Sequence, residues 1–159
     1  MKVLSFGSLN VDYVYNVDQF VCPGETKLVK GMDTFCGGKG LNQSIALARA
    51  GVAAYHAGLI GQDGRILIDR LNLAGVNTAL IEEIDSHSGH AIIQVDAAGQ
   101  NNILLYGGAN RMVTEPYVDK VLRTFDAGDI ILLQNEINLV GYIIAKAKEK
   151  GMRVAFNAA

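Results

Sequence analysis

Short β-type runs alternate along this chain with segments whose apolar residues recur at helical spacing, and this alternation constrains the fold most. The expected strands cover residues 2–7, 53–61, 78–84, 129–136 and 152–157. The expected helices cover residues 41–51, 64–75, 114–125 and 138–151. Such a pattern predicts an α/β fold with a mainly parallel central sheet between layers of helices.

Two stretches break this alternation. Residues 13–35 contain alternating apolar positions on either side of a Pro-Gly turn, and residues 90–106 read as a hairpin with a turn around Gly99 and Asn101. We expect them to form a small antiparallel sheet that projects from the main one and acts as a lid, with segments at about 13–36 and 88–108. The whole chain, residues 1–159, is then part of one domain.

The final expected strand is followed by only two alanines. A buried strand of an α/β fold is normally followed by a helix that covers it. We therefore expect the sheet to be unfinished in this chain, with its second half absent.

Composition excludes several classes of partner. The 159 residues carry a net charge of −2 without a run of basic residues, which argues against nucleic acid. The apolar runs are much shorter than a membrane span, and the amino terminus lacks the pattern of a signal peptide. We expect a cytoplasmic protein without a membrane contact. The scattered histidines, including His87 and His90, favour a polar loop over a metal site.

The glycine-rich segment FCGGKGLNQS, residues 35–44, precedes an expected helix. It lacks the spacing of a Walker phosphate loop, because Asp33 stands at the first glycine position and Gly40 follows Lys39. It also lacks the third glycine of a dinucleotide fingerprint, where Gln43 stands. A structural turn and a site for an anion or a hydroxyl group both remain open from the residues alone.

Several motifs, taken in order, resemble the amino-terminal half of the ribokinase-like, or PfkB, family of sugar and nucleoside kinases. They are GSLNVD at 7–12, PGET at 23–26, GGKGLNQS at 37–44, GGAN at 107–110, LLQNE at 132–136 and FNAA at 156–159. The resemblance implies a three-layer α/β domain with a β lid that closes over the sugar. It also implies a homodimer formed through this lid.

Six residues match the sugar-binding positions of the family: Asn10, Asp12, Gly38, Lys39, Asn42 and Glu136. Asp12 can accept hydrogen bonds from two adjacent hydroxyl groups, and Asn10 can both donate and accept, as a polyol requires. The resemblance makes the glycine loop chiefly a sugar clamp. Asn157 is a weaker match, because the family usually has proline where Ala158 stands. Gly107, Gly108 and Asn110 fit either a hinge or a simple turn.

The family's catalytic base belongs to a GAGD signature that opens a helix in the second half of the fold. The nearest match here is AGD at 127–129, which leads into an expected strand, so Asp129 is not given the catalytic role. We assign no catalytic residue to this chain. The resemblance implies ATP, Mg²⁺ and K⁺ as cofactors, with the ATP and K⁺ sites in the absent half.

The resemblance implies an ATP-dependent kinase that phosphorylates a sugar hydroxymethyl group, with this chain carrying the sugar-binding half and inactive alone. Ribose is the leading acceptor, giving ribose 5-phosphate. Fructose, 2-keto-3-deoxygluconate and nucleosides remain alternatives. A sugar-binding or dimerising module without a nucleotide site is the alternative outside the enzyme class.

Overall fold

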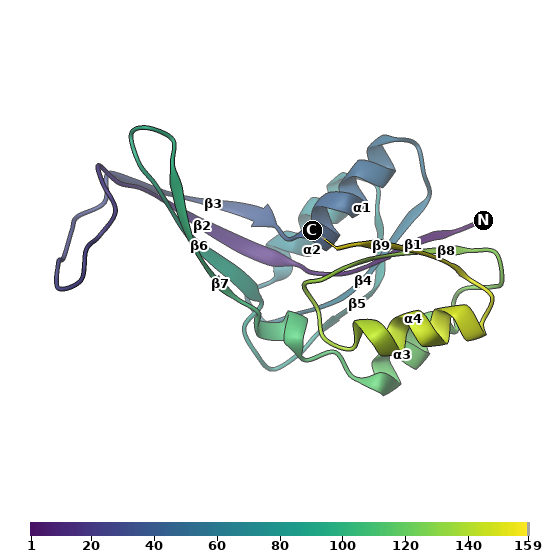
Figure 1. The fold of residues 1–159 in the computed structure, drawn as a ribbon. Helices are drawn as coiled ribbons and strands as arrows, with labels where there is room; N and C mark the ends of the chain where they lie inside the picture. Colours follow the sequence, from purple (N-terminus) through teal and green to yellow (C-terminus); the bar gives the residue numbers. More distant parts are fainter. Residues whose placement is uncertain (159) are drawn as a thin grey trace.

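The computed structural model describes residues 1–158 and shows an α/β fold with two sheets (Figure 1). The main sheet has five parallel strands in the order β5-β4-β1-β8-β9. Its strands are β5 (Asn77–Glu83), β4 (Ala54–Ile60), β1 (Val3–Phe6), β8 (Ile130–Gln134) and β9 (Arg153–Asn157). This arrangement confirms the predicted parallel sheet.

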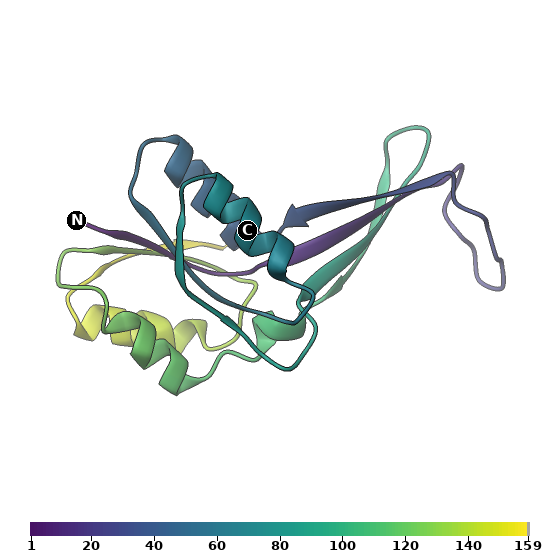
Figure 2. The ribbon, with the colours of Figure 1, turned by 180° about the vertical axis from the view of Figure 1, so that it is seen from behind.

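Helices cover the main sheet on both faces and so make three layers. Helices α1 (Lys39–Arg49) and α2 (Arg65–Leu73) lie on one face, and α3 (Glu115–Leu122) and α4 (Val140–Glu149) lie on the other (Figures 1 and 2). Each helix turns an apolar stripe inward, as its periodicity predicts. Leu67 and Leu71 of α2 are completely buried, as are Ile143 and Ala147 of α4.

The central strand β1 is buried on both faces, because helices pack above and below it. Leu4 and Phe6 belong to the core under α3 and α4, together with Phe125 and Ile131. A second core lies under α1 and α2. The main sheet is therefore a rigid base whose strand ends can position polar side chains.

The second sheet has four strands in the order β3-β2-β6-β7 and projects from the main sheet (Figures 1 and 2). Its strands are β2 (Asn10–Asn16), β3 (Gly31–Gly37), β6 (Gly89–Val95) and β7 (Asn101–Tyr106). The expectation of a wholly antiparallel sheet is wrong in one pairing: β2 and β6 are parallel. Both strands run outward from the main sheet, so the two hairpins meet side by side.

Two local details differ from the sequence expectations. Thr114 caps α3 by accepting a hydrogen bond from the Tyr117 amide, but the helix ends at Leu122 instead of Phe125. The final residues continue as a turn that brings Phe125 into the core. Asn101 begins β7 and does not belong to the preceding turn. Within residues 1–158 no helix combines the length and apolar character needed to cross a membrane.

Candidate functional site

Polar residues gather where the main sheet meets the second sheet. β1 and β8 both end at this edge, and β2 and α1 both begin there. Ligands of open α/β sheets generally bind outside the carboxyl ends of the strands. The short link between β1 and β2, residues 7–9, passes from one sheet to the other and contacts the start of α1.

The glycine loop makes this close contact possible. Gly38 has a φ of 95°, and a β-carbon there would lie 2.8 Å from the Ser8 carbonyl oxygen. A β-carbon on Gly40 would lie 2.5 Å from the Ser8 backbone nitrogen. The Leu41 amide donates to the Ser8 carbonyl at 3.0 Å. The glycines are thus required for the first turn of α1 to dock on the link before β2.

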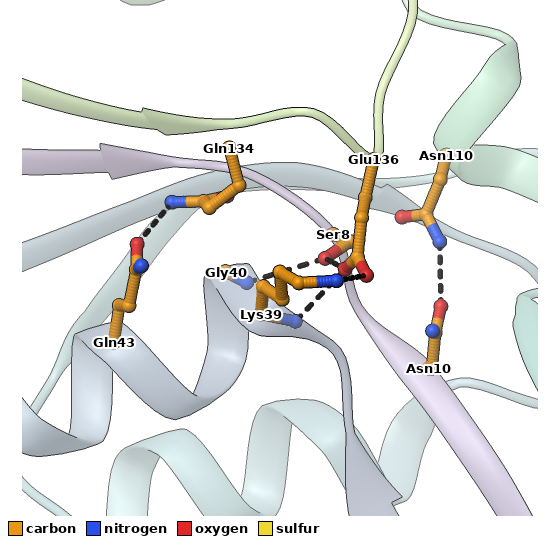
Figure 3. A network of polar contacts seen from close by, with 8 residues as sticks. All are labelled: Ser8, Asn10, Lys39, Gly40, Gln43, Asn110, Gln134 and Glu136. Atoms are coloured by element: carbon orange, nitrogen blue, oxygen red, sulfur yellow. Dashed lines mark hydrogen bonds and ion pairs between the residues drawn. The ribbon is translucent and has the colours of Figure 1, made fainter. Parts of the chain in front are cut away.

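Glu136 is the centre of a polar network at the start of α1 (Figure 3). Its Oε1 accepts from Lys39 Nζ at 2.5 Å, and its Oε2 accepts from the Lys39 amide at 2.9 Å and from Ser8 Oγ at 2.5 Å. Burial alone would raise the pKa of Glu136. The hydrogen bonds from Lys39 and Ser8 and the charge of Lys39 outweigh burial, so the pKa lies below its ordinary value. Glu136 is therefore held as a carboxylate with both oxygens engaged.

Asp12 experiences the opposite balance. It lies in β2 and is partly buried, and burial raises its pKa above the ordinary value. The negative charge of Glu136 adds to this increase. A ligand with hydroxyl donors would stabilise the ionised form of Asp12, because hydroxyl groups can donate to the carboxylate.

All six residues that match the sugar-binding positions line one cavity of about 310 Å³. Asn10 and Asp12 come from β2, Gly38 precedes α1, Lys39 and Asn42 lie in its first turn, and Glu136 follows β8. The second sheet adds apolar side chains to the same cavity: Ala91, Ile93, Ile103 and Leu105. The cavity thus combines hydrogen-bonding groups from four segments with an apolar wall, as sites for small molecules generally do.

Asn110 ties the second sheet to the main sheet. It lies in the 3₁₀ helix η1 (Gly108–Arg111) and is almost completely buried. Its Oδ1 accepts from the Leu9 amide at 3.0 Å, and its Nδ2 donates to the Leu9 carbonyl at 3.2 Å and to Asn10 Oδ1 at 2.7 Å (Figure 3). Asn110 therefore fixes the link between the sheets and orients the Asn10 amide.

Ser8 is the site residue that the sequence reasoning missed. Its hydroxyl donates to Glu136 and accepts from the Gly40 amide at 3.2 Å, so it joins β8, α1 and the β1–β2 link. Its position within GSLNVD, two residues before the matched Asn10, was an available signal. Gln134 and Gln43 form a further bridge from β8 to α1, with 2.6 Å between Gln134 Nε2 and Gln43 Oε1 (Figure 3).

Other residues considered from the sequence lie elsewhere. Asp129 precedes β8 at the opposite end of that strand, where it accepts from the backbone amides of Lys2 and Asp126. Asn157 is the last residue of β9. His87 faces Asp63, whereas His90 packs between tyrosine rings in the second sheet. Among the described residues, no group of three His, Cys, Asp or Glu side chains could hold a metal ion.

Comparisons with known proteins agree on one family. The model of the pfkB family carbohydrate kinases matches residues 1–159. Ribokinase from Staphylococcus aureus is 35% identical over 164 residues, covering 99% of this chain and 54% of the relative. The chain spans about half the length of the ribokinases that it matches.

Solved structures give the same result. Ribokinase from Cryptococcus neoformans in complex with ADP has a TM-score of 0.83 and 34% identity, with 99% of this chain and 49% of the other covered. Ribokinase from Arabidopsis thaliana with ribose and ATP has a TM-score of 0.86 and 28% identity, with coverages of 99% and 53%. On its sequence, its fold and the arrangement of its polar residues, this chain belongs to the pfkB family of carbohydrate kinases.

Proposed function

We propose that this chain is the acceptor half of an ATP-dependent sugar kinase whose preferred acceptor is ribose and whose product is ribose 5-phosphate. The observation that carries this proposal is the convergence of Asn10, Asp12, Gly38, Lys39, Asn42 and Glu136 around one cavity. The similarity to ribokinases favours ribose over fructose, 2-keto-3-deoxygluconate or a nucleoside.

The residues divide the work of holding a polyol. Asp12 accepts hydrogen bonds from sugar hydroxyl groups, while Asn10 and Asn42 can donate and accept. Lys39 and Glu136 set the local charge and fix the first turn of α1. The apolar side chains of β6 and β7 cover the ring and limit access of water. Binding therefore presents a hydroxyl group in a fixed direction, which lowers the entropic barrier to its reaction.

Phosphoryl transfer also requires a donor and charge neutralisation, which ATP and Mg²⁺ supply in such kinases. We assign no residue of this chain to ATP, Mg²⁺ or K⁺, because the described residues include neither a phosphate loop nor a cluster of metal ligands. The catalytic base is likewise assigned to the remainder of the fold. The chain's own residues bind and orient the acceptor.

We further propose that the second sheet acts as a lid and forms a homodimer contact in a cytoplasmic protein. Ile103 and Leu105 line the cavity, so the alternation of β7 turns Leu104 and Tyr106 to the opposite face. These two side chains are 66% and 53% exposed, and Met32 of β3 is 51% exposed. Such an apolar face can bury itself against a second copy. Light scattering should give twice the monomer mass, and a monomer at micromolar concentration would contradict the dimer.

The test of the kinase function is ribose-dependent ADP formation by the protein as its own gene encodes it. Lys39→Met should weaken ribose binding by about tenfold or more, because a charge-assisted contact is lost from the site. Lys120→Met is the matched control, since Lys120 pairs with Glu82 on the surface. If the wild type binds ribose but forms no ADP, the protein is a binding module and not a kinase. If Lys39→Met binds ribose with unchanged affinity, Lys39 does not belong to the site.

A further inference from the structure

A buried pair of an imidazole and a hydroxyl group lies behind the candidate site, where α1 packs on the main sheet. His56 of β4 and Ser44 of α1 have no exposed surface, and His56 Nδ1 lies 2.7 Å from Ser44 Oγ. Ser5 lies beside His56 on β1, and its hydroxyl donates to the Gly40 carbonyl of α1 at 3.3 Å. Neither His56 nor Ser44 lines the sugar cavity, so contacts with an acceptor do not explain why this polar pair is buried.

The other ring nitrogen of His56 lies toward the link between β1 and β2. A β-carbon on Gly58 would lie 3.2 Å from His56 Nε2 and 2.7 Å from the Gly7 carbonyl oxygen, so both atoms border the space that Gly58 leaves open. Among residues 1–158, Nε2 has no partner with the full geometry of a hydrogen bond. A contact with the Gly7 backbone nevertheless raises the pKa of His56 against the larger effect of burial. The Gly7 carbonyl is therefore the acceptor available to a proton on Nε2.

These two neighbours assign one tautomer to His56. Burial lowers its pKa to about 4, so the imidazole is neutral at neutral pH. A proton on Nε2 faces the Gly7 carbonyl, which can only accept, and Nδ1 then accepts from the Ser44 hydroxyl. In this state a single ring on β4 contacts both α1 and the β1–β2 link.

Gly7 begins the link that carries fixed contacts of the site. A β-carbon on Gly7 would lie 2.9 Å from Gly40 Cα, so the link and the first turn of α1 touch here. One residue later, the Ser8 hydroxyl donates to Glu136 and accepts from the Gly40 amide. A displacement of Gly7 would therefore move Ser8 and, with it, a carboxylate that lines the sugar cavity.

We propose that His56 is a positioning residue of the sugar site, because its neutral imidazole holds the first turns of α1 against the β1–β2 link. This inference rests on the proposed sugar site and adds a residue that acts on it from behind. His56 lies outside the cavity, so its effect passes through Ser44 on one side and Gly7 on the other. Residues that line a binding site keep their geometry only when the groups behind them are fixed as well.

The experiment compares ribose dissociation constants, measured by calorimetry at pH 7.5, with urea unfolding of the same variants of the protein as its own gene encodes it. Ser44→Ala/His56→Phe fills the space of the ring but removes both of its nitrogens and the serine hydroxyl. His56→Gln is the rescue variant, since its amide can accept from Ser44 and donate to the Gly7 carbonyl. Val76→Ala is the matched control, because Val76 is buried in the core under α1 and α2 and lies outside the cavity.

The double variant should weaken ribose binding by about fivefold or more, because the contacts of the first turn of α1 with the link loosen together. His56→Gln should stay within about twofold of the wild type, and so should Val76→Ala even where it is less stable than the wild type. If the double variant does not fold, Ser44→Ala alone replaces it, with an expected loss of about threefold.

Unchanged ribose affinity in the double variant, or in Ser44→Ala where that replaces it, would overturn the positioning role and leave the sugar site intact. An equal loss in Val76→Ala would do the same, because reduced stability would then explain the effect. A loss in His56→Gln as large as that in the double variant would also overturn it, since restored hydrogen bonds would then not matter. A wild-type protein that does not bind ribose would overturn the sugar site and the positioning role together.

Discussion

Lowering the pH should destabilise this protein through one buried histidine. His56 lies in β4 beneath α1 with no exposed surface, and its Nδ1 is 2.7 Å from Ser44 Oγ. Burial lowers the pKa of His56 from 6.5 to about 4, although a contact with the Gly7 backbone opposes this shift. Below pH 6.5 the unfolded state binds a proton that the folded state does not bind until about pH 4. The free energy of unfolding therefore falls with pH across that window.

The size of this effect follows from the two pKa values. Between pH 8 and pH 5, His56 alone should reduce the free energy of unfolding by about 2 kcal/mol. Urea unfolding followed by circular dichroism measures this change. The double variant Ser44→Ala/His56→Phe removes the titrating group without leaving the serine hydroxyl unpaired. Between pH 8 and pH 5, its free energy of unfolding should therefore fall by about 2 kcal/mol less than that of the wild type.

The control for this experiment is His87→Gln. The His87 side chain is 80% exposed, and its removal should preserve the pH dependence of the wild type. Carboxylates elsewhere contribute equally to the wild type and the double variant and cancel in that comparison. An equal decrease in the double variant and the wild type would refute the assignment of this pH dependence to His56.

Three further predictions concern the candidate site. Glu136→Gln removes a negative charge that raises the pKa of Asp12. Asp12 should then stay ionised to a lower pH, and ribose binding should persist with it, as a titration of ribose affinity against pH would show. Gly40→Ala should lower the free energy of unfolding by about 1–3 kcal/mol, because its β-carbon meets the Ser8 backbone; Gly141→Ala, a control in α4 with open space, should raise it by about 0.4–1 kcal/mol in the same urea assay. Ser8→Ala removes a hydrogen bond to Glu136 and should weaken ribose binding by about threefold to tenfold, whereas an unchanged affinity would make Ser8 dispensable.

The sequence predicted the main sheet well because local periodicity and tertiary burial agree there. The helix expected at residues 41–51 is α1, and its apolar residues Leu41 and Ile45 are both buried. The strand pairing of the second sheet was harder to predict, because the sequence pattern of a hairpin does not indicate which other strands it pairs with. The parallel pairing of Asn10 with Gly89 joins strands separated by about half the chain, and only the packing of both hairpins against the main sheet decides it.

The site residues were matched through a family resemblance, and their geometry depends on groups that the motifs leave unspecified. The sequence places Lys39 after two glycines, but it could not show that Glu136 accepts hydrogen bonds from both the amide and the ammonium group of Lys39. Nor could it show that Ser8 links Glu136 to the start of α1. These contacts connect segments 97 and 128 residues apart, so they follow from the topology of the sheet.

The cavity lies between the two sheets, so a movement of one sheet relative to the other would change the distances between its charged groups. Lys39 and Glu136 are joined at the edge of the main sheet, whereas Asp12 belongs to β2 of the second sheet. The two sheets are linked by residues 7–9, which Asn110 clamps at Leu9. A rotation of the second sheet about this clamp would change the distance between the Asp12 and Glu136 carboxylates while leaving the Lys39 pair intact. Bringing the carboxylates together is unfavourable unless hydroxyl groups donate to Asp12, because like charges repel in a partly buried site. We therefore expect the proposed closure of the second sheet to be coupled to the binding of a polyol.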